Sequence, residues 1–527
     1  MLEECYTLNV SELFERAYKL FPDKEVIYDR SRRMTYRELH DESFALSAAL
    51  ADLGVKKGDR IACCLPNWHE FIVVYLAAAH LGAIIVPFNT RYREHEVEYI
   101  LENSGAKVAF MTESFSGVPH LEQFSNAKKK IPTLERLITV RFETNEHDSY
   151  SKLIARGRNL PFVPAKIDRK EDVFTILYTS GTTGKPKGAM LTHANVVHTG
   201  SITAEALQCT PDDVFLVAVP VFHVFGMVPS IATTFSVGGK MVLMDTYKAV
   251  EALQLIQDEK ISVKHGVPSM FILELNHPDF NKFDLSSLRT GIIAAAPCPI
   301  EVVKRIRSDM GCNICISYGL TETSATMVIT SFDDDDTIRT ETVGRALPGA
   351  QVKIVGKNRE TLPHGEIGEI ACKSFGVMKG YWNMPEQTKA AFDEEGWFYT
   401  GDLGTLDEKG YVRIVGRAKE MIIRGGYNIY PREIEELIFT FPGVMEAAVV
   451  GLPDSVLGEI SCAAIRVKPG ETVDLEELKK FLQSKIADYK VPDKYIIVDE
   501  FPLTASGKLK KMELQEQLKI KLGDELR

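Results

Sequence analysis

The residue types best suited to holding phosphate groups gather in residues 178–188, which read Y-T-S-G-T-T-G-K-P-K-G. Glycines let a backbone approach a ligand closely and turn its N–H groups toward it, while hydroxyls donate to oxyanions and lysines supply mobile positive charge. This combination suits a triphosphate, or the pyrophosphate that leaves from one. The apolar residues 173–177 directly before it predict a short buried strand.

The stretch departs from the Walker A loop, G-x-x-x-x-G-K-[ST], because Gly181 and Gly184 stand too close together and Pro186 follows the lysine. Pro186 also keeps Lys185 out of a helix interior. We therefore expect a mobile loop between two strands that closes over phosphates. A surface loop without a ligand is the alternative, and this motif alone does not exclude it.

The order of these residues is more specific than their composition. The stretch, continued by A-M-L-T-H at residues 189–193, resembles the phosphate loop of the adenylate-forming superfamily. That superfamily contains acyl-CoA synthetases, firefly-type luciferases and the adenylation domains of peptide synthetases. Further motifs that resemble it follow in the family's order over almost the whole chain. The resemblance implies nucleotide contacts from Thr179, Ser180, Gly181, Thr182, Thr183, Gly184 and Lys185.

Two further motifs would surround the acyl group. Residues 220–226, P-V-F-H-V-F-G, resemble the family's aromatic-histidine motif, which implies that a neutral His223 orients the substrate carboxylate or gates its pocket. Taken alone, such a histidine is more often a satisfied core residue. Residues 293–298, I-A-A-A-P-C, resemble the segment that lines both adenine and the acyl group. The resemblance assigns Phe222, His223, Val224, Ala294 and Ala295 to the acyl pocket, and Ala295, Ala296 and Pro297 to the nucleotide site.

Before the Ala-Pro pair at 296–297, where the family usually carries glycines, this sequence has alanines. Each added methyl narrows the space beside the acyl chain, and one methylene in a pocket changes discrimination by about 1–3 kcal/mol. We therefore expect a compact or medium-length apolar acid, such as a medium-chain fatty, alicyclic or aromatic carboxylate. A long-chain fatty acid stays open, because a tunnel can run elsewhere.

Residues 316–323, I-S-Y-G-L-T-E-T, resemble the family's highly specific Y-G-x-T-E motif. The resemblance implies that Tyr318 and Gly319 lie beside adenine, to which the tyrosine offers a flat apolar face. Thr321 would contact the α-phosphate. Glu322 would hold Mg²⁺, a hard cation that prefers carboxylate and phosphate oxygens. The alternative for Glu322 is an acid that stabilises a helix N-terminus.

A ribose-binding motif and a hinge motif come next. Y-T-G-D at residues 399–402 resembles the first, which implies that Asp402 accepts hydrogen bonds from both ribose hydroxyls. G-R-A-K-E at residues 416–420 resembles the second. It implies a ribose contact from Arg417 and a hinge at Lys419, about which a small domain turns.

The last two motifs concern coenzyme A and the reacting phosphate. The resemblance places Gly425 and Gly426 on the pantetheine path, where a side chain would block passage. P-L-T-A-S-G-K at residues 502–508 implies that Lys508 bridges the substrate carboxylate and the α-phosphate of ATP. Without the turn before it, a lysine in this Lys-rich tail would be a solvated charge.

The implied reaction follows from charge. A carboxylate must attack an anionic α-phosphate, so repulsion and the leaving group set the barrier. Lys508, Mg²⁺ on Glu322 and the phosphate loop would neutralise that charge. After the small domain turned about Lys419, the thiol of coenzyme A would attack the acyl-adenylate and release AMP and acyl-CoA.

The elements that must position these motifs alternate between strand-like and helix-like runs up to about residue 300, which predicts an α/β fold with mainly parallel sheets. Thr35 and Glu38 form a capping box that opens a helix. The apolar run 71–88 predicts a buried helix that passes into a buried strand, and no integral membrane segment. The charge runs 128–130 and 333–336 predict solvated loops.

Past residue 416 the composition becomes rich in lysine and glutamate and predicts a mixed α+β unit. Its predicted elements are a helix at 431–439, a strand at 447–450, a helix at 475–486 and a strand at 495–498. We therefore predict two domains. Residues 1–416 form a large multi-subdomain N-terminal AMP-binding and acyl-binding domain. Residues 417–527 form a small mobile C-terminal domain, joined to it at the Lys419 hinge.

Composition restricts the partners. The 527 residues are 45% hydrophobic and 26% charged, as in an ordinary globular protein, and the net charge of −11 argues against nucleic acid or an anionic membrane. The N-terminus shows no signal peptide, and nine cysteines without a framework predict reduced, mostly buried thiols in a cytoplasmic chain. The oligomeric state stays open, with a homodimer as one option.

Together these observations predict an AMP-forming carboxylic acid–CoA ligase that uses ATP, Mg²⁺ and coenzyme A. The alternatives are a long-chain fatty-acid–CoA ligase, an adenylating enzyme that loads a carrier protein, and a luciferase-type oxygenase. A nucleotide-binding regulator on the same fold should have lost catalytic groups, yet Glu322, Asp402 and Lys508 are all present. The favoured direction of the reaction stays open.

Overall fold

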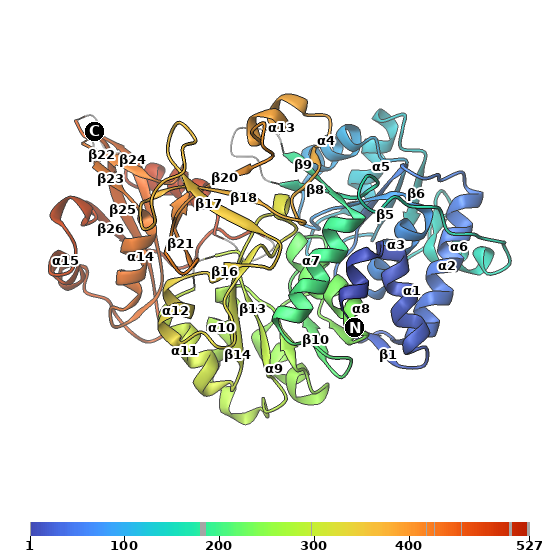
Figure 1. Ribbon diagram of the computed structural model, residues 1–527, viewed down its shortest axis with the longest axis horizontal. Coiled ribbons are helices and arrows are strands. Elements are labelled where there is room, and N and C mark those ends of the chain that lie inside the picture. The colour runs from blue at the N-terminus through green and yellow to red at the C-terminus, as the bar shows by residue number, and fades with distance from the viewer. Residues whose placement is uncertain are drawn as a thin grey trace.

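The computed structural model describes residues 2–179, 186–296, 298–417, 419–425, 427–454, 456–504 and 509–523. Two large sheets and two small ones make up the fold, and helices cover the sheets (Figure 1). The predicted α/β class with mainly parallel sheets is confirmed. No helix in this described part of the chain has both the length and the apolar run that crossing a bilayer requires.

The first large sheet has eight strands, and its inner strands pair in parallel around β3 and β4. Strands β8 and β9, on either side of the phosphate-loop motif, pair antiparallel. In spatial order the strands are β19 (Gly380–Tyr381), β9 (Lys187–Thr192), β8 (Val173–Thr179), β4 (Ile84–Pro87), β3 (Arg60–Cys64), β5 (Val108–Met111), β6 (Arg136–Thr139) and β7 (Asp148–Ser149).

The second large sheet has nine strands, parallel from β14 to β1 and antiparallel at both edges. Parallel strands need crossover connections, which here are mostly helices and place helices on the faces of the sheet. In spatial order the strands are β16 (Arg345–Ala346), β15 (Val328–Ile329), β14 (Asn313–Tyr318), β13 (Thr290–Ile293), β12 (Val263–Lys264), β10 (Val214–Val217), β11 (Lys240–Leu243), β1 (Glu25–Tyr28) and β2 (Arg33–Thr35).

The main hydrophobic core lies between these two sheets, and helices packed against each sheet fill it (Figure 1). All 13 residues of α3 (His69–Leu81) are buried, and the buried strand β4 follows, as the apolar run predicts. Thr35 and Glu38 form the predicted capping box of α2 (Tyr36–Asp52). The other helices around this core are α1 (Val10–Leu20), α6 (Tyr150–Gly157), α7 (His193–Ala206), the π-helix η2 (Gly226–Ala232) and α8 (Thr233–Val237), with the 3₁₀ turn η1 (Glu3–Thr7). Helices α4 (Glu94–Ser104) and α5 (His120–Lys130) pack on the other face of the eight-stranded sheet, in a separate hydrophobic cluster.

A second core lies on the other face of the nine-stranded sheet. Its helices are α9 (Ala249–Asp258), α10 (Pro268–Leu275) and α11 (Ile300–Asp309), with α12 (Asp336–Glu341) and the 3₁₀ turns η3 (Phe280–Lys282) and η4 (Thr321–Thr323) nearby. A four-stranded antiparallel sheet follows: β17 (Gln351–Val355), β18 (Gly368–Lys373), β20 (Phe398–Leu406) and β21 (Val412–Arg417), with α13 (Pro385–Ala391) inserted before β20.

The chain after residue 417 builds its own sheet, and hydrophobic clusters cover both faces of that sheet. It lies at one end of the molecule, coloured orange to red in Figure 1. Its elements are β22 (Ile422–Arg424), β23 (Tyr427–Ile429), α14 (Pro431–Phe439), β24 (Val444–Asp454), β25 (Gly458–Val467), α15 (Leu475–Gln483), η5 (Asp488–Lys490), β26 (Lys494–Ile497) and α16 (Lys511–Lys521). This independent core is what the mixed α+β composition leads one to expect.

Two predictions about charge runs were wrong in part. Residues 128–130 form the last turn of α5, where basic side chains face the negative end of the helix dipole. In the run 333–336, Asp334 is buried rather than solvated. Its carboxylate accepts a hydrogen bond from the Tyr411 hydroxyl at 2.6 Å, which offsets part of the cost of burying it. The predicted burial of the thiols is confirmed: all nine cysteines are buried and free.

Candidate active site

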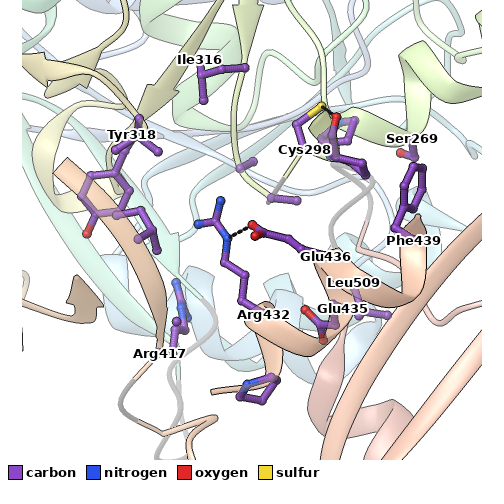
Figure 2. Close-up of a pocket in the computed structure, with 18 of the residues that line it drawn as sticks. Ser269, Cys298, Ile316, Tyr318, Arg417, Arg432, Glu435, Glu436, Phe439 and Leu509 are labelled. Atoms are coloured by element: carbon purple, nitrogen blue, oxygen red, sulfur yellow. Dashed lines mark hydrogen bonds and ion pairs between the residues drawn. The ribbon is translucent and has the colours of Figure 1, made fainter. Parts of the chain in front are cut away.

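Two cavities lie where the large sheets face the chain after residue 417. The first, of about 310 Å³, is lined by the ends of β13, β14 and β21, by α14 and by Leu503 and Leu509. Figure 2 shows Tyr318 and Arg417 on one side of it and Arg432 of α14, paired with Glu436, reaching in from another. The second, of about 270 Å³, lies between Phe222, α10 and the small C-terminal sheet.

The first cavity holds three predicted nucleotide-binding residues in direct contact. The hydroxyl of Tyr318 donates to Oδ2 of Asp402 at 2.8 Å, and Oδ1 of Asp402 lies 3.1 Å from Nε of Arg417. Asp402 and Arg417 are cross-strand partners in β20 and β21, which explains their pairing. These two contacts hold the carboxylate of Asp402 in one orientation at the cavity.

Burial and the charge of Asp402 raise the pKa of Tyr318 well above its usual range, so the phenol keeps its proton and acts as the donor. Gly319, directly after it, has no room for a side chain. A Cβ there would lie 1.6 Å from the carbonyl oxygen of Ala325. This close approach fixes the turn that carries the motif from β14 into η4.

The alanine segment borders the same cavity. Ala295 and Ala296 both line it, and Ala294 packs against the main core. Ala295 has φ = +70°, a left-handed conformation that costs a residue with a Cβ roughly 1–2 kcal/mol. Its methyl therefore stands at the cavity at an energetic cost that glycine would not carry. Pro297 lies outside the described residues.

Thr321 and Glu322 form the turn η4. Oε1 of Glu322 accepts a hydrogen bond from the Tyr381 hydroxyl at 2.9 Å, and its backbone oxygen accepts one from the amide of Met378 at 2.8 Å. Among the described residues, Glu322 has no cationic side chain in ion-pair contact. Its carboxylate is thus oriented by a neutral donor, the Tyr381 hydroxyl.

The phosphate-loop motif lies mostly in residues 180–185, outside the described residues. The strands on either side of it are held by α4. The Tyr99 hydroxyl donates to the carbonyl of Pro186 at 3.0 Å, and the Tyr178 hydroxyl donates to Oδ1 of Asn103 at 2.6 Å. Thr179, the last residue of β8, pairs with Lys187 at the start of β9.

Three of the predicted acyl-pocket residues, Phe222, His223 and Val224, lie directly before the π-helix η2. Nδ1 of His223 accepts the backbone N–H of Phe225 at 3.2 Å, which leaves Nε2 to carry the proton of a neutral ring. Phe222 lines the second cavity, and Val224 is buried in the main core. The buried Asn67 fixes this segment, because its side chain bonds the backbone of Val217, Val219 and Val221.

Several predicted residues near the C-terminus are not brought to these cavities or are not described. Lys419 is exposed in the turn between β21 and β22. Gly425, in the β22–β23 hairpin at φ = +54°, lines neither cavity. Gly426 and Lys508 lie outside the described residues, although Thr504 and Leu509 on either side of Lys508 in the sequence line the second and first cavity.

A buried cluster of Asp29, His69 and Glu70 also has ligand atoms close enough to hold a metal ion. Arg141 occupies it instead: its guanidinium contacts the carboxylates of Asp29 at 2.7 Å and Glu70 at 2.8 Å. The Arg141 guanidinium also lies 3.9 Å from the centre of the Trp68 ring. The arginine already neutralises the acids, so the cluster is a structural ion network.

Sequence reasoning missed Tyr381, Asn67 and Asn103. None of them stands in a motif that the sequence singled out, and each acts on a motif residue from a distant element. For Tyr381 a weak signal existed, because a tyrosine beside a glycine is typical of a strand that approaches another backbone closely. The pairing of β19 with β9 places Tyr381 beside the strand that follows the phosphate-loop motif. The paired residues are about 190 positions apart, a separation that no local pattern reveals.

Comparison with known proteins finds relatives over almost the whole chain. The family model described as AMP-binding enzyme matches residues 14–382, and the model of the AMP-binding enzyme C-terminal domain matches residues 433–508. The Bacillus subtilis protein named "Putative acyl-CoA synthetase YngI" is 39% identical over 98% of both chains. The human mitochondrial medium-chain acyl-CoA ligase ACSF2 is 33% identical over 98% of this chain and 88% of its own.

Among solved structures, the anthranilate CoA ligase AuaEII in complex with anthranoyl-AMP superposes with a TM-score of 0.90, at 26% identity and 98% coverage of each chain. The likeness therefore spans both large sheets and the C-terminal unit. Together with the two family models, which match most of the sequence in the expected order, it leads to one conclusion: the chain belongs to the AMP-binding enzyme family.

Proposed function

We propose that the protein is an AMP-forming carboxylic acid–CoA ligase. It converts a carboxylate, ATP and coenzyme A into acyl-CoA, AMP and pyrophosphate through an acyl-adenylate. The observation that carries the proposal is the contact of Tyr318, Asp402 and Arg417 on a cavity beside Ala295. Relatives named as acyl-CoA synthetases and ligases support the same reaction class.

The nucleotide would lie in the first cavity. Adenine would rest against the flat face of Tyr318, beside Gly319, Ala295 and Ala296. Its ribose hydroxyls would donate to Asp402, and Arg417 would hold that carboxylate and contact the ribose. Phosphate contacts would come from Thr321 and from the 179–185 segment.

Glu322 would hold Mg²⁺. The donor fits, because a carboxylate oxygen is a ligand that Mg²⁺ prefers, and Glu322 has no competing cation among the described residues. When bound, Mg²⁺ would supply positive charge to the phosphates. The protein's part is to hold the carboxylate in one orientation through Tyr381 and Met378.

Lys508 would neutralise the charge that develops when the carboxylate attacks the α-phosphate, with His223 at the carboxylate end of the acyl site. The positions of Thr504 and Leu509 on the two cavities support this role. We further infer that 1–416 and 417–527 are separate domains, and that the second turns about Lys419. In the present arrangement Gly425 lines neither cavity. The turn about Lys419 would bring Gly425 and Gly426 to the path of coenzyme A.

The substrate would be a compact or medium-length apolar acid, such as a medium-chain fatty, alicyclic or aromatic carboxylate. Ala295 supports this choice, because it is assigned to both the nucleotide site and the acyl pocket and its methyl group occupies space beside the cavity. The names of the relatives, a medium-chain acyl-CoA ligase and an anthranilate CoA ligase, point in the same direction. We also infer a cytoplasmic location from the nine free, buried thiols, and keep a homodimer as one option for the assembly.

One experiment tests the reaction class and the substrate together. Purified protein is incubated with ATP, Mg²⁺ and coenzyme A, and release of AMP is measured across fatty, alicyclic, aromatic and dicarboxylic acids. We expect AMP and acyl-CoA in equal amounts with apolar acids of compact or medium size. AMP release that requires a carrier protein would favour the carrier-loading alternative, and no AMP release with any acid would refute the proposal.

A further inference from the structure

We propose that Tyr381 is a positioning residue, which holds the carboxylate of Glu322 in the orientation that binds the cation of the nucleotide. The inference rests on the proposed function, since it takes Glu322 as the carboxylate that meets Mg²⁺. The two residues are 59 positions apart in the chain, and the Tyr381 hydroxyl lies 2.9 Å from Oε1 of Glu322.

The position of Tyr381 is fixed by backbone as well as by its ring. It lies in β19, which pairs antiparallel with β9, so that Tyr381 is opposite Ala189. Its backbone N–H donates to Oγ1 of Thr388 at 2.9 Å. Gly380 before it has φ = +143°, and a Cβ there would lie 2.8 Å from the Thr388 side chain. The strand therefore has little freedom to move the phenol away from Glu322.

The same segment also holds the backbone of the acid. The amide of Met378 donates to the backbone oxygen of Glu322 at 2.8 Å. Residues 378–381 therefore form hydrogen bonds with both the main chain and the carboxylate of Glu322. The hydrogen bond occupies Oε1, so Oε2 is the oxygen that would meet the ion. Partners of this kind fix the orientation of a metal-binding carboxylate and raise its affinity for the ion.

Tyr381 also meets the strand that follows the phosphate-loop motif. The ammonium of Lys187, at the start of β9, lies 4.9 Å from the centre of the Tyr381 ring. This cation–π contact uses the face of the ring, while the hydrogen bond uses the hydroxyl. Replacing Tyr381 with phenylalanine therefore removes the contact to Glu322 and keeps the contact to Lys187.

Tyr411 offers a matched control. It too is about nine-tenths buried, and its hydroxyl donates to Oδ1 of Asp334 at 2.6 Å, but Asp334 is not one of the predicted site residues. Tyr381→Phe and Tyr411→Phe each remove one buried phenol–carboxylate hydrogen bond. Both variants should lose a similar amount of thermal stability, so a difference between them in ligand binding reports on the site.

The experiment measures ATP binding by calorimetry without the acid substrate, so that no turnover occurs, over a series of free Mg²⁺ concentrations that begins in EDTA. In the wild type, ATP affinity should rise with Mg²⁺. In Tyr381→Phe, the Mg²⁺ concentration at the midpoint of this rise should increase about tenfold or more, with ATP affinity in EDTA unchanged. Tyr411→Phe should follow the wild-type curve.

A Tyr381→Phe curve that coincides with the wild type would overturn the inference. So would an equal loss of ATP affinity with and without Mg²⁺, because a purely structural role of Tyr381 predicts that result. A wild-type affinity that does not respond to Mg²⁺ would instead refute the metal assignment within the proposed function, and the inference with it.

Discussion

The hydroxyl of Tyr318 and the carboxylate of Asp402 lie 2.8 Å apart, although 84 residues separate them in the chain. Tyr318 ends β14 of the nine-stranded sheet, and Asp402 lies in β20 of the small antiparallel sheet. The bond therefore joins two sheets at the edge of the first cavity. It gives the ribose-binding carboxylate of the proposed function a fixed orientation before a nucleotide arrives.

Tyr318→Phe should weaken ATP binding while it keeps an aromatic face for adenine. A hydrogen bond to a charged group contributes roughly 1.5–3 kcal/mol, so we expect KM for ATP to rise about tenfold or more with little change in kcat. Discrimination between ATP and 2′-deoxy-ATP should also fall. Tyr150→Phe serves as the control, because the hydroxyl of the buried Tyr150 donates to Glu42 at 2.6 Å away from both cavities. An unchanged KM in Tyr318→Phe would contradict the role given to the bond.

Lys508→Ala should separate the two half-reactions. Loss of one electrostatic donor at a developing charge costs about 10²–10³ in rate or more, so adenylate formation should nearly stop. Thioester formation from supplied acyl-AMP and coenzyme A should continue, because no phosphorus centre is attacked by carboxylate in that step. Lys510→Ala is the control, since Lys510 forms an exposed ion pair with Glu513 at 3.0 Å. Equal losses in both half-reactions would refute the proposed role of Lys508.

Ala295→Gly should stabilise the protein and widen its substrate range. Relief of the left-handed strain at φ = +70° outweighs the added freedom of glycine in the unfolded chain, for a net gain of about 0.5–1 kcal/mol in the free energy of unfolding. Bulkier acids should then be accepted with lower KM. Ala296→Gly is the matched control: Ala296 lines the same cavity without a positive φ, so its replacement should destabilise. Chemical denaturation measures the first effect, and the AMP-release assay measures the second.

His40 should make stability depend on pH. Its ring stacks between Tyr18 and Phe44, and its two nitrogens lie 3.2 Å from Glu15 and 3.1 Å from Asp41. Burial acts to lower the pKa of His40, but the hydrogen bonds to these two carboxylates outweigh it, and the folded-state pKa is raised. A raised pKa contributes stability that is fully present below the unfolded pKa of about 6.5 and is lost as the pH rises through the folded pKa.

The difference in unfolding temperature between wild type and His40→Gln should therefore be larger at pH 5.5–6 than at pH 8.5. The size of this change depends on how strongly Glu15 and Asp41 stabilise the protonated ring. Glu15→Gln should reduce this pH dependence, because it removes one of the two partners. The buried His80 lies close to His40 and stays neutral, since burial lowers its pKa to about 3. A difference that grows with pH would disprove this account.

Local patterns predicted much of the fold. The capping box of Thr35 and Glu38 opens α2, and the apolar run 71–88 forms α3 and β4 as expected. Helix α14 begins and ends at the predicted residues, whereas β24 extends beyond both ends of the predicted strand 447–450 and α15 ends at Gln483, before the predicted 486. Ends of elements depend on tertiary partners, such as the long pairing of β24 with β25, which a local pattern does not contain.

The sequence by itself determined which residue types are available: the order of the motifs named the family, and the placement of strands and helices followed from hydrophobic periodicity and capping. Only the tertiary structure decided which of them meet. That Tyr318 bonds Asp402, that Tyr381 bonds Glu322, and that Ala295 takes a left-handed conformation all depend on which strands lie side by side. Periodicity reports the face a residue presents to its immediate neighbours, whereas sheet order arises from packing the whole core, and contacts across about 60 to 190 residues follow from that packing alone.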